Sequence, residues 1–189
     1  MTLKRLRHAG SARLSAGISG IFNRLRLRLE GCRYGKKLRT NGRLRIRNDG
    51  KIVLGSGVTV NSSVMSDPLG GSPCTVLVTA KNGEITIGDR TGLSNTAIFA
   101  FERVTVGCDV RIGAGVKIYD GDFHPVGFSA RMADETGVHA SVTVEDGVFL
   151  GAHSVIGAGS VVTCDIPAGQ VWAGNPARFI RTLDEDGAS

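Results

Sequence analysis

A six-residue repeat constrains this chain more than any other feature of its sequence. From Val106 the letters read VGCDVR, IGAGVK and IYDGDF, and from Val144 they read VEDGVF, LGAHSV, IGAGSV and VTCDIP. Each hexad begins with Val, Leu or Ile, and Gly often follows. A hexapeptide period of this kind predicts a parallel β-helix, whose coils must stack because no single unit can bury its apolar face alone.

Two positions of each hexad are expected to point into the coil, the first residue and the residue four places later. The expected first residues are Leu54, Val60, Ile87, Leu93, Phe99, Val106, Ile112, Ile118, Val144, Leu150, Ile156 and Val162. The expected second residues are Thr91, Ala97, Val110, Val116, Val148, Ser154 and Ser160. Arg103 breaks the rule, and the step from Phe99 to Val106 is seven residues, so we expect one extra residue at a corner there.

Composition agrees with a narrow coil that has many corners, since the chain contains 27 Gly but only 5% aromatic residues. The four cysteines are scattered without a CxxC pair, which favours a reduced, cytoplasmic protein. No window approaches the roughly 18 apolar residues of a membrane-spanning helix. The basic N-terminus also lacks the apolar core of a signal peptide.

Charge divides the chain into a basic head and an acidic body. Residues 1–51 contain 15 Lys and Arg against 2 Asp and Glu, whereas residues 52–189 contain 8 against 15. We therefore expect an anionic partner near the N-terminus. No recognition motif for nucleic acid occurs, so specific nucleic-acid binding is not expected. The predicted divisions are a basic helical segment at 1–37, a β-helix at 38–183 and a tail at 184–189.

A helix is predicted over residues 11–30, because apolar residues recur there at spacings of three and four. These residues are Leu14, Ile18, Phe22, Leu25 and Leu29. The interpretation that we favour packs this stripe on the body of the protein or on a neighbouring subunit. The alternative is a helix that lies on anionic lipid at the cytoplasmic face of the membrane.

Two longer motifs carry a family resemblance. The segments IGAGVKIYDGDFHPV and VIGAGSVVTCDIPAGQVWAGNPARFIR resemble the hexapeptide-repeat acyltransferases, and within them the O-acetyltransferases of sugars and bacterial surface polysaccharides. The resemblance covers roughly residues 44–183. It implies a left-handed parallel β-helix, a homotrimer, and acetyl-CoA bound as donor between adjacent subunits, with no metal required.

His124 is the predicted general base. It lies where the repeat gives way to a loop at 119–142, and a loop of this length inside a compact repeat is uncommon unless it is functional. An imidazole with a pKa near 6.5 can take the proton of an attacking hydroxyl and pass it to the leaving thiolate. Asp120 and Asp122 share a face with His124 in an extended segment. Either carboxylate could orient the imidazole or bind the acceptor.

The resemblance also assigns binding roles. Ser94, Asn95 and Tyr119 correspond to acceptor contacts. The expected contacts to coenzyme A are Gly151, Ala152, Ala158, Thr163, Arg178 and Arg181, the last two at phosphates, which a charged guanidinium fork suits.

The chain also departs from the family pattern. Two hexads are missing between Ala152 and His153, Phe149 stands where Trp is common, and Cys164 stands where Lys is common. The expected function is O-acetylation of a sugar hydroxyl in a surface polysaccharide or its precursor. Transfer to an amino sugar and a trimeric scaffold without activity are the alternatives. Carbonic anhydrase chemistry needs three converging imidazoles, and His124, His139 and His153 form no single short motif.

Overall fold

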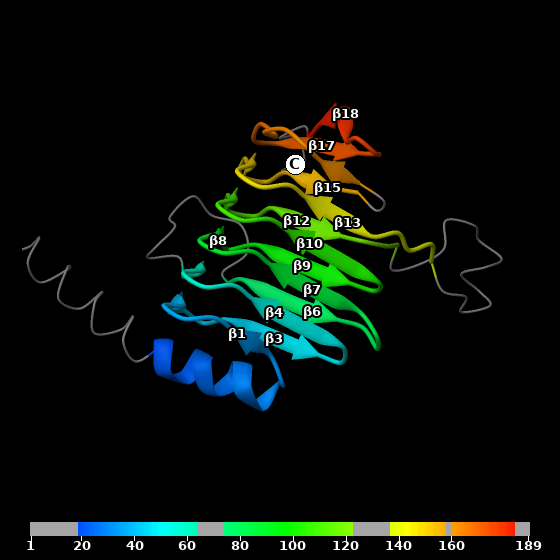
Figure 1. Ribbon diagram of the computed structural model, residues 1–189. Coiled ribbons are helices and arrows are strands. Elements are labelled where there is room, and N and C mark those ends of the chain that lie inside the picture. The colour runs from blue at the N-terminus through cyan, green and yellow to red at the C-terminus, as the bar shows by residue number, and fades with distance from the viewer. Residues whose placement is uncertain (1–18, 64–73, 123–136, 158–159, 184–189) are drawn as a thin grey trace, which may run out of the picture.

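The computed structural model describes residues 19–63, 74–122, 137–157 and 160–183. A helix at 19–29 precedes strands that wind into a tapering, three-sided prism (Figure 1). From β1 to β16, successive strands belong to successive sheets, so each turn of the chain adds one strand to each of three sides.

The described residues form three sheets. Sheet A contains β1 (Arg33–Tyr34), β4 (Lys51–Leu54), β7 (Glu84–Ile87), β10 (Arg103–Val106), β13 (Val142–Val144) and β16 (Val161–Val162). Sheet B contains β2 (Arg39–Gly42), β5 (Thr59–Ser62), β8 (Gly92–Ser94), β11 (Arg111–Ile112) and β14 (Phe149–Leu150). Sheet C contains β3 (Arg45–Asn48), β6 (Val76–Thr79), β9 (Ala97–Ala100), β12 (Lys117–Tyr119), β15 (Val155–Ile156), β17 (Gln170–Ala173) and β18 (Arg178–Thr182).

Strand pairing is parallel up to the C-terminal end, where β17 and β18 form an antiparallel hairpin. The left-handed parallel β-helix predicted from the sequence is confirmed. The chain turns at three edges of the prism, which we name by the sheets that they join: the AB edge, the BC edge and the CA edge. The first coil begins at Arg33, ahead of the boundary expected at residue 38.

The repeat correctly predicts most of the core. The expected first residues of the hexads are buried, with relative exposures of 3% or less, except for Phe99. Of the expected second residues, Thr91, Val110, Val116, Ser154 and Ser160 are fully buried. The column of β-branched and aliphatic side chains inside the prism is therefore the main source of its stability.

The predicted register is wrong at β9. Ile98 and Thr96 point inward and are buried, while Phe99 and Ala97 face outward. Leu93 pairs beside Ile112, and Ile98 pairs beside Ile118, so the step across this BC corner is five residues instead of six. Because side chains alternate along a strand, a shift of one residue reverses every face. The following CA corner is correspondingly longer, which places Arg103 outside and Val104 inside.

The predicted packing of the N-terminal stripe on the body of the same chain is also wrong for the residues that are described, and its packing on a neighbouring subunit stays a prediction. Phe22, Leu25 and Leu29 are exposed, and the helix is instead held to the first coil by Asn23 and Leu27, which are both buried. Leu14 and Ile18 lie outside the described residues. In the part of the chain that the structure describes, no helix is long and apolar enough to span a membrane.

Candidate functional site

At the CA edge after β12, residues 120–122 pair with residues 138–140 on either side of the segment that carries His124. We call this pairing the loop stem. The amide of Asp122 donates to the carbonyl of Val138 (3.1 Å), and the amide of Ala140 donates to the carbonyl of Asp120 (2.8 Å). Gly121 and His139 form an antiparallel bridge between these two bonds. Residues 123–136, His124 among them, lie outside the described residues, so the role of His124 stays a prediction.

Asp120 holds this edge together. Its carboxylate is fully buried and accepts three backbone N–H bonds, from Phe101 (2.7 Å), Glu102 (2.7 Å) and Arg103 (2.6 Å). Those amides belong to the corner between β9 and β10 and to Arg103, the first residue of β10. Both carboxylate oxygens are therefore committed to the backbone, which gives Asp120 a structural role that the sequence did not indicate.

Asp122 and His139 lie at the same edge but in different surroundings. The side chain of Asp122 is exposed. The imidazole of His139 stacks on Phe101, with ring centroids 4.2 Å apart, and its Nδ1 is buried against Gly121. Nδ1 has no hydrogen-bond partner among the described residues. Reasoning from sequence gave His139 no role, although its position at the return of the loop was a signal that could have identified it.

Tyr119 faces outward from sheet C next to the loop stem. It is half-buried, and burial raises the pKa of its phenol, so the hydroxyl stays protonated at neutral pH and can donate a hydrogen bond. Its predicted acceptor contact stays a prediction, now with a defined position beside Asp120.

The other predicted residues gather mainly at the BC edge. Along this edge, backbone amides donate to backbone carbonyls that lie earlier in the chain. The pairs are Asn95 to Asn61 (2.9 Å), Gly115 to Asn95 (3.1 Å), His153 to Ala114 (2.7 Å), Gly169 to Ala152 (2.9 Å) and Leu183 to Gly169 (2.6 Å). Ser94 and Asn95 therefore lie on the same column as Gly151 and Ala152. Ser94 is part-exposed, whereas Asn95 is buried in a left-handed conformation with φ of 44°.

The predicted coenzyme A residues are divided between edges. Arg181 pairs with Val171 toward the BC end of the β17–β18 hairpin, near Gly151 and Ala152 in the column. Arg178 pairs with Ala173 at the CA end of the hairpin. Thr163 is exposed at the AB edge, one sheet away. Ala158 lies outside the described residues. Within one chain, three of the six predicted residues come together.

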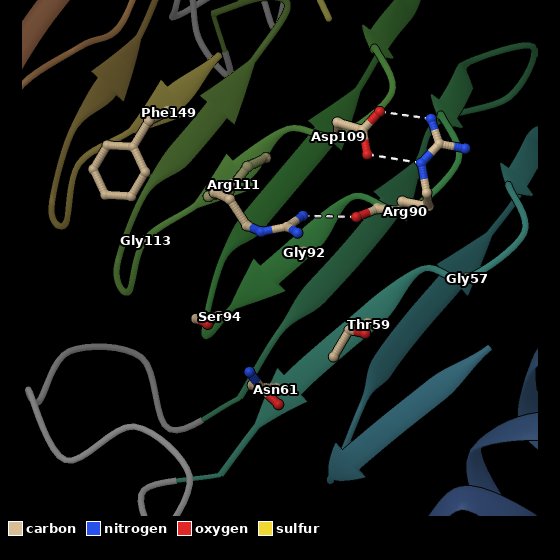
Figure 2. A pocket seen from close by; sticks show the side chains of 11 residues that line it. Gly57, Thr59, Asn61, Arg90, Gly92, Ser94, Asp109, Arg111, Gly113 and Phe149 are labelled. Atoms are coloured by element: carbon tan, nitrogen blue, oxygen red, sulfur yellow. Dashed lines mark hydrogen bonds and ion pairs between the residues drawn. The ribbon is translucent and has the colours of Figure 1, made fainter. Parts of the chain in front are cut away.

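A groove of about 630 Å³ crosses the outer face of sheet B, beside the BC edge (Figure 2). Its floor is made of short side chains from successive strands, which include Thr59, Asn61, Gly92 and Ser94. Phe149 lies toward the C-terminal end of the groove, half-exposed. Ser94 is the predicted acceptor residue that lines this groove, and Asn95, although adjacent in sequence, is not part of its wall.

Two arginines give the groove its charge. Arg90 forms a two-pronged ion pair with Asp109 (2.8 and 2.6 Å), which lowers the pKa of Asp109. The Nη1 of Arg111 donates to the carbonyl of Arg90 (2.6 Å), so its guanidinium lies along the groove in Figure 2. A Cβ at Gly92 would come within 3.4 Å of the Arg111 side chain. The sequence separation of 19 between Gly92 and Arg111 was the available signal for this pairing.

Metal ligands do not gather in the described part of the chain, where no three His, Cys, Asp or Glu side chains lie close enough to hold one ion. His139 lies at the CA edge and His153 at the BC edge. Cys164 is exposed, while burial raises the pKa of Cys32 to about 11, which keeps that thiol protonated.

No family model matches the chain. Among solved structures, AntD, an N-acyltransferase from Bacillus cereus in complex with dTDP and 3-hydroxybutyryl-CoA, superposes with a TM-score of 0.54 at 20% identity, over 85% of this chain and 88% of that one. The polysialic acid O-acetyltransferase OatWY gives 0.52 at 17% identity, over 84% and 77%. This chain has the fold of the hexapeptide-repeat acyltransferases. The resemblance predicted from the sequence is confirmed at the level of fold.

The relatives found by sequence similarity differ from one another in the activities that their names state. Gamma carbonic anhydrase 1 of Arabidopsis thaliana is 34% identical over 104 residues, which cover 41% of this chain and 38% of the relative. The 2,3,4,5-tetrahydropyridine-2,6-dicarboxylate N-acetyltransferase of Clostridium perfringens is 38% identical over 76 residues, which cover 40% and 32%. The chain thus spans less than half the length of these curated relatives. The names of these two relatives describe different chemistry.

Proposed function

We propose that the protein is an acetyl-CoA-dependent O-acetyltransferase that acts on a sugar hydroxyl in a surface polysaccharide or its precursor. The observation that carries the proposal is the loop stem at the CA edge, where residues 120–122 pair with residues 138–140 on either side of the segment that contains His124. A segment anchored on both sides can hold an imidazole against two bound substrates, and such alignment supplies much of the rate of a direct transfer.

In the proposed step, the acceptor hydroxyl oxygen attacks the thioester carbonyl of acetyl-CoA. His124 accepts the hydroxyl proton as the C–O bond forms. The C–S bond breaks as the tetrahedral intermediate collapses, and the imidazolium returns the proton to the leaving thiolate. No acyl-enzyme forms, and the proton count balances at the histidine.

Asp122 is the carboxylate that we assign to His124. An orienting carboxylate needs an oxygen available to accept the imidazole N–H. Both oxygens of Asp120 already accept backbone bonds, while the Asp122 side chain is exposed two residues before His124. Asp120 then acts indirectly, by fixing the corner from which the histidine segment leaves.

A complete site in this proposal needs a second copy of the chain. The histidine segment belongs to the CA edge, whereas Ser94, Gly151 and Arg181 belong to the BC edge, and sheet C separates the two edges. The outer side of sheet C is largely apolar and half-buried, with Val76, Val78, Ala97, Phe99, Tyr119, Val155 and Val171. Packing of this face within a homotrimer would bring the BC edge of one subunit toward the CA edge of the next. We further propose that the trimer works in the cytoplasm, at the inner face of the membrane.

The test is a comparison of His124→Ala with His139→Ala. Removal of a general base costs about 10²- to 10⁴-fold in kcat, so we expect that loss for His124→Ala with an unchanged Tm. His139→Ala should lower the Tm, because the stack on Phe101 is lost, and should keep kcat within a few-fold. If His124→Ala retains full transfer, the proposed mechanism is wrong. Parallel assays with hydroxyl and amine acceptors distinguish O- from N-acetylation.

The other two candidate functions make distinct predictions in the same experiments. A scaffold would show no heat on titration of acetyl-CoA into the trimer. A metal-dependent lyase, which the similarity to the plant carbonic anhydrase raises, would hydrate CO₂ when purified with zinc. We expect acetyl-CoA to bind with about one site per subunit, and no CO₂ hydration above the buffer rate.

A further inference from the structure

The helix at 19–29 closes the N-terminal end of the prism and is fixed there in one rotation (Figure 1). The side-chain amide of Asn23 donates to Thr40 (3.1 Å) and to the carbonyl of Gly42 (2.8 Å), and its oxygen accepts the amide of Leu44 (3.3 Å). Leu27 is fully buried beneath the helix. The helix is therefore an integral cap of the first coil.

Two arginines fasten the sides of this helix. Arg24 donates to the carbonyl of Leu38 (2.9 Å), and Arg26 donates to the carbonyl of Leu44 (3.2 Å). With both flanks bonded to the coil, the helix cannot roll to hide its outer face.

The outer face is apolar. It consists of Ile21, Phe22, Leu25 and Leu29, which are 69%, 67%, 53% and 79% exposed. At 100° per residue these four side chains lie opposite Asn23 and Leu27. A contiguous apolar face that the chain itself holds outward indicates a docking surface. We call these four residues the cap face.

The helix and the first coil, which carry the cap face, are rich in cations. Residues 19–51 contain eleven Lys and Arg against two Asp and Glu, and the exposed ones outside sheet C include Arg28, Arg33, Lys36, Lys37, Arg39 and Arg43. Two copies of this surface placed face to face would bring like charges together, which disfavours self-association. An anionic bilayer complements both parts, because acyl chains accept the apolar side chains and headgroup phosphates attract the cations.

We propose that the cap face docks on an anionic membrane, with the prism axis standing away from the bilayer. This inference gives a physical basis to the proposed location and does not depend on acyl transfer. Three strand spacings, β3 to β6 to β9 to β12, separate the first coil from the histidine segment, which is about 14 Å at the usual spacing. A glycan anchored in the same bilayer would extend to that height.

Vesicle flotation of the full chain tests the proposal, with neutral phosphatidylcholine compared with phosphatidylcholine that contains 30% phosphatidylglycerol. The informative variant is Leu25→Asp, and its matched control is Ile180→Asp, because Ile180 is 57% exposed at the opposite end of the prism. We expect flotation with anionic vesicles only, an approximately tenfold loss of vesicle affinity in Leu25→Asp, and no loss in Ile180→Asp. Salt at 0.5 M should weaken binding.

Three flotation results would overturn the inference. They are no flotation of the unaltered chain, equal flotation with neutral and anionic vesicles, and undiminished flotation of Leu25→Asp. A smaller molecular mass of Leu25→Asp in light scattering would assign the cap face to a second copy of the chain and would also refute it. Since Leu25 is exposed, its variant should keep the Tm of the unaltered chain, and acetyl-CoA titration remains an independent measure of the proposed function.

Discussion

The BC and CA edges both border sheet C, and the backbone turns differently at each of them. At the BC edge, backbone bonds repeat from coil to coil, and small residues such as Gly151 allow close stacking. At the CA edge, the fourth coil opens, and its corner is held by the carboxylate of Asp120. The BC edge includes the long connection from Ser62 to Val76 and is one residue short between Leu93 and Ile98, but its column of backbone bonds continues past both and suits an extended ligand. The CA edge, which we call the irregular edge, requires the buried carboxylate of Asp120. In the proposed function this edge positions the segment that carries His124.

The largest expected effect is on the irregular edge, in Asp120→Asn. An amide keeps the shape but has one acceptor oxygen, and its NH₂ group faces backbone donors. Leaving buried N–H groups unpaired costs about 1–3 kcal/mol each, so we expect a loss of roughly 3 kcal/mol and a Tm lowered by about 10 °C. Differential scanning calorimetry measures this loss.

The control for that experiment is Asp122→Asn, at an exposed carboxylate two residues away. It should leave the Tm unchanged and should lower kcat, since we assign Asp122 to His124. Equal Tm values for the two variants would show that the corner does not need a buried charge.

The next effect probes the BC edge, in Gly151→Ala. A Cβ at this position would overlap the backbone nitrogen of Ala168 in the next coil. Overpacking of this kind costs about 1–3 kcal/mol, and it would also distort the column, so we expect a lower Tm and a several-fold higher KM for acetyl-CoA. Gly92→Ala is the matched control, because its Cβ would meet only the Arg111 side chain at 3.4 Å. An unchanged Tm in Gly151→Ala would mean that the coils can separate locally.

Sequence reasoning predicted the regular parts of the molecule better than the irregular ones, for a physical reason. Hexads report inward positions wherever each corner has a fixed length, which is why Ile112, Leu150 and Ile156 were correct. Between Leu93 and Ile98 one residue is missing from a corner. Since both Ile98 and Phe99 are apolar, composition alone could not reveal the slip.

The candidate site was predictable as a set of residue types and not as an arrangement. Asp120 was identified from its place beside His124, but its three backbone partners come from a corner 17 to 19 residues earlier. The apolar stripe of the helix was correctly identified, but the sequence did not indicate which side of the helix faces the first coil. The hydrogen bonds of Asn23 turn that residue toward the coil and leave Phe22 and Leu25 exposed. Such choices are made by tertiary contacts, which periodicity does not contain.

A smaller effect separates the two ends of the β17–β18 hairpin. If acetyl-CoA lies along the BC edge, Arg181→Ala should raise its KM about five- to tenfold through the loss of a phosphate contact, whereas Arg178→Ala, at the CA end, should raise it less than twofold. Initial rates at varied acetyl-CoA measure both. The reverse order would move the donor to the CA edge and would unite it with the histidine segment on one chain.

The smallest effect uses the third edge as a reference, in Asp109→Asn. Asp109 is exposed and pairs with Arg90, so the same substitution that is severe at Asp120 should change the Tm by no more than about 2 °C at pH 7. The pair lowers the pKa of Asp109. Its contribution is therefore present above the unfolded pKa, near 4, and is lost as pH falls through the folded pKa. Melting curves of both proteins should converge below pH 4 and in high salt. A drop as large as that of Asp120→Asn would mean that burial is not what makes the CA edge sensitive, and that carboxylates hold all the corners of the prism alike.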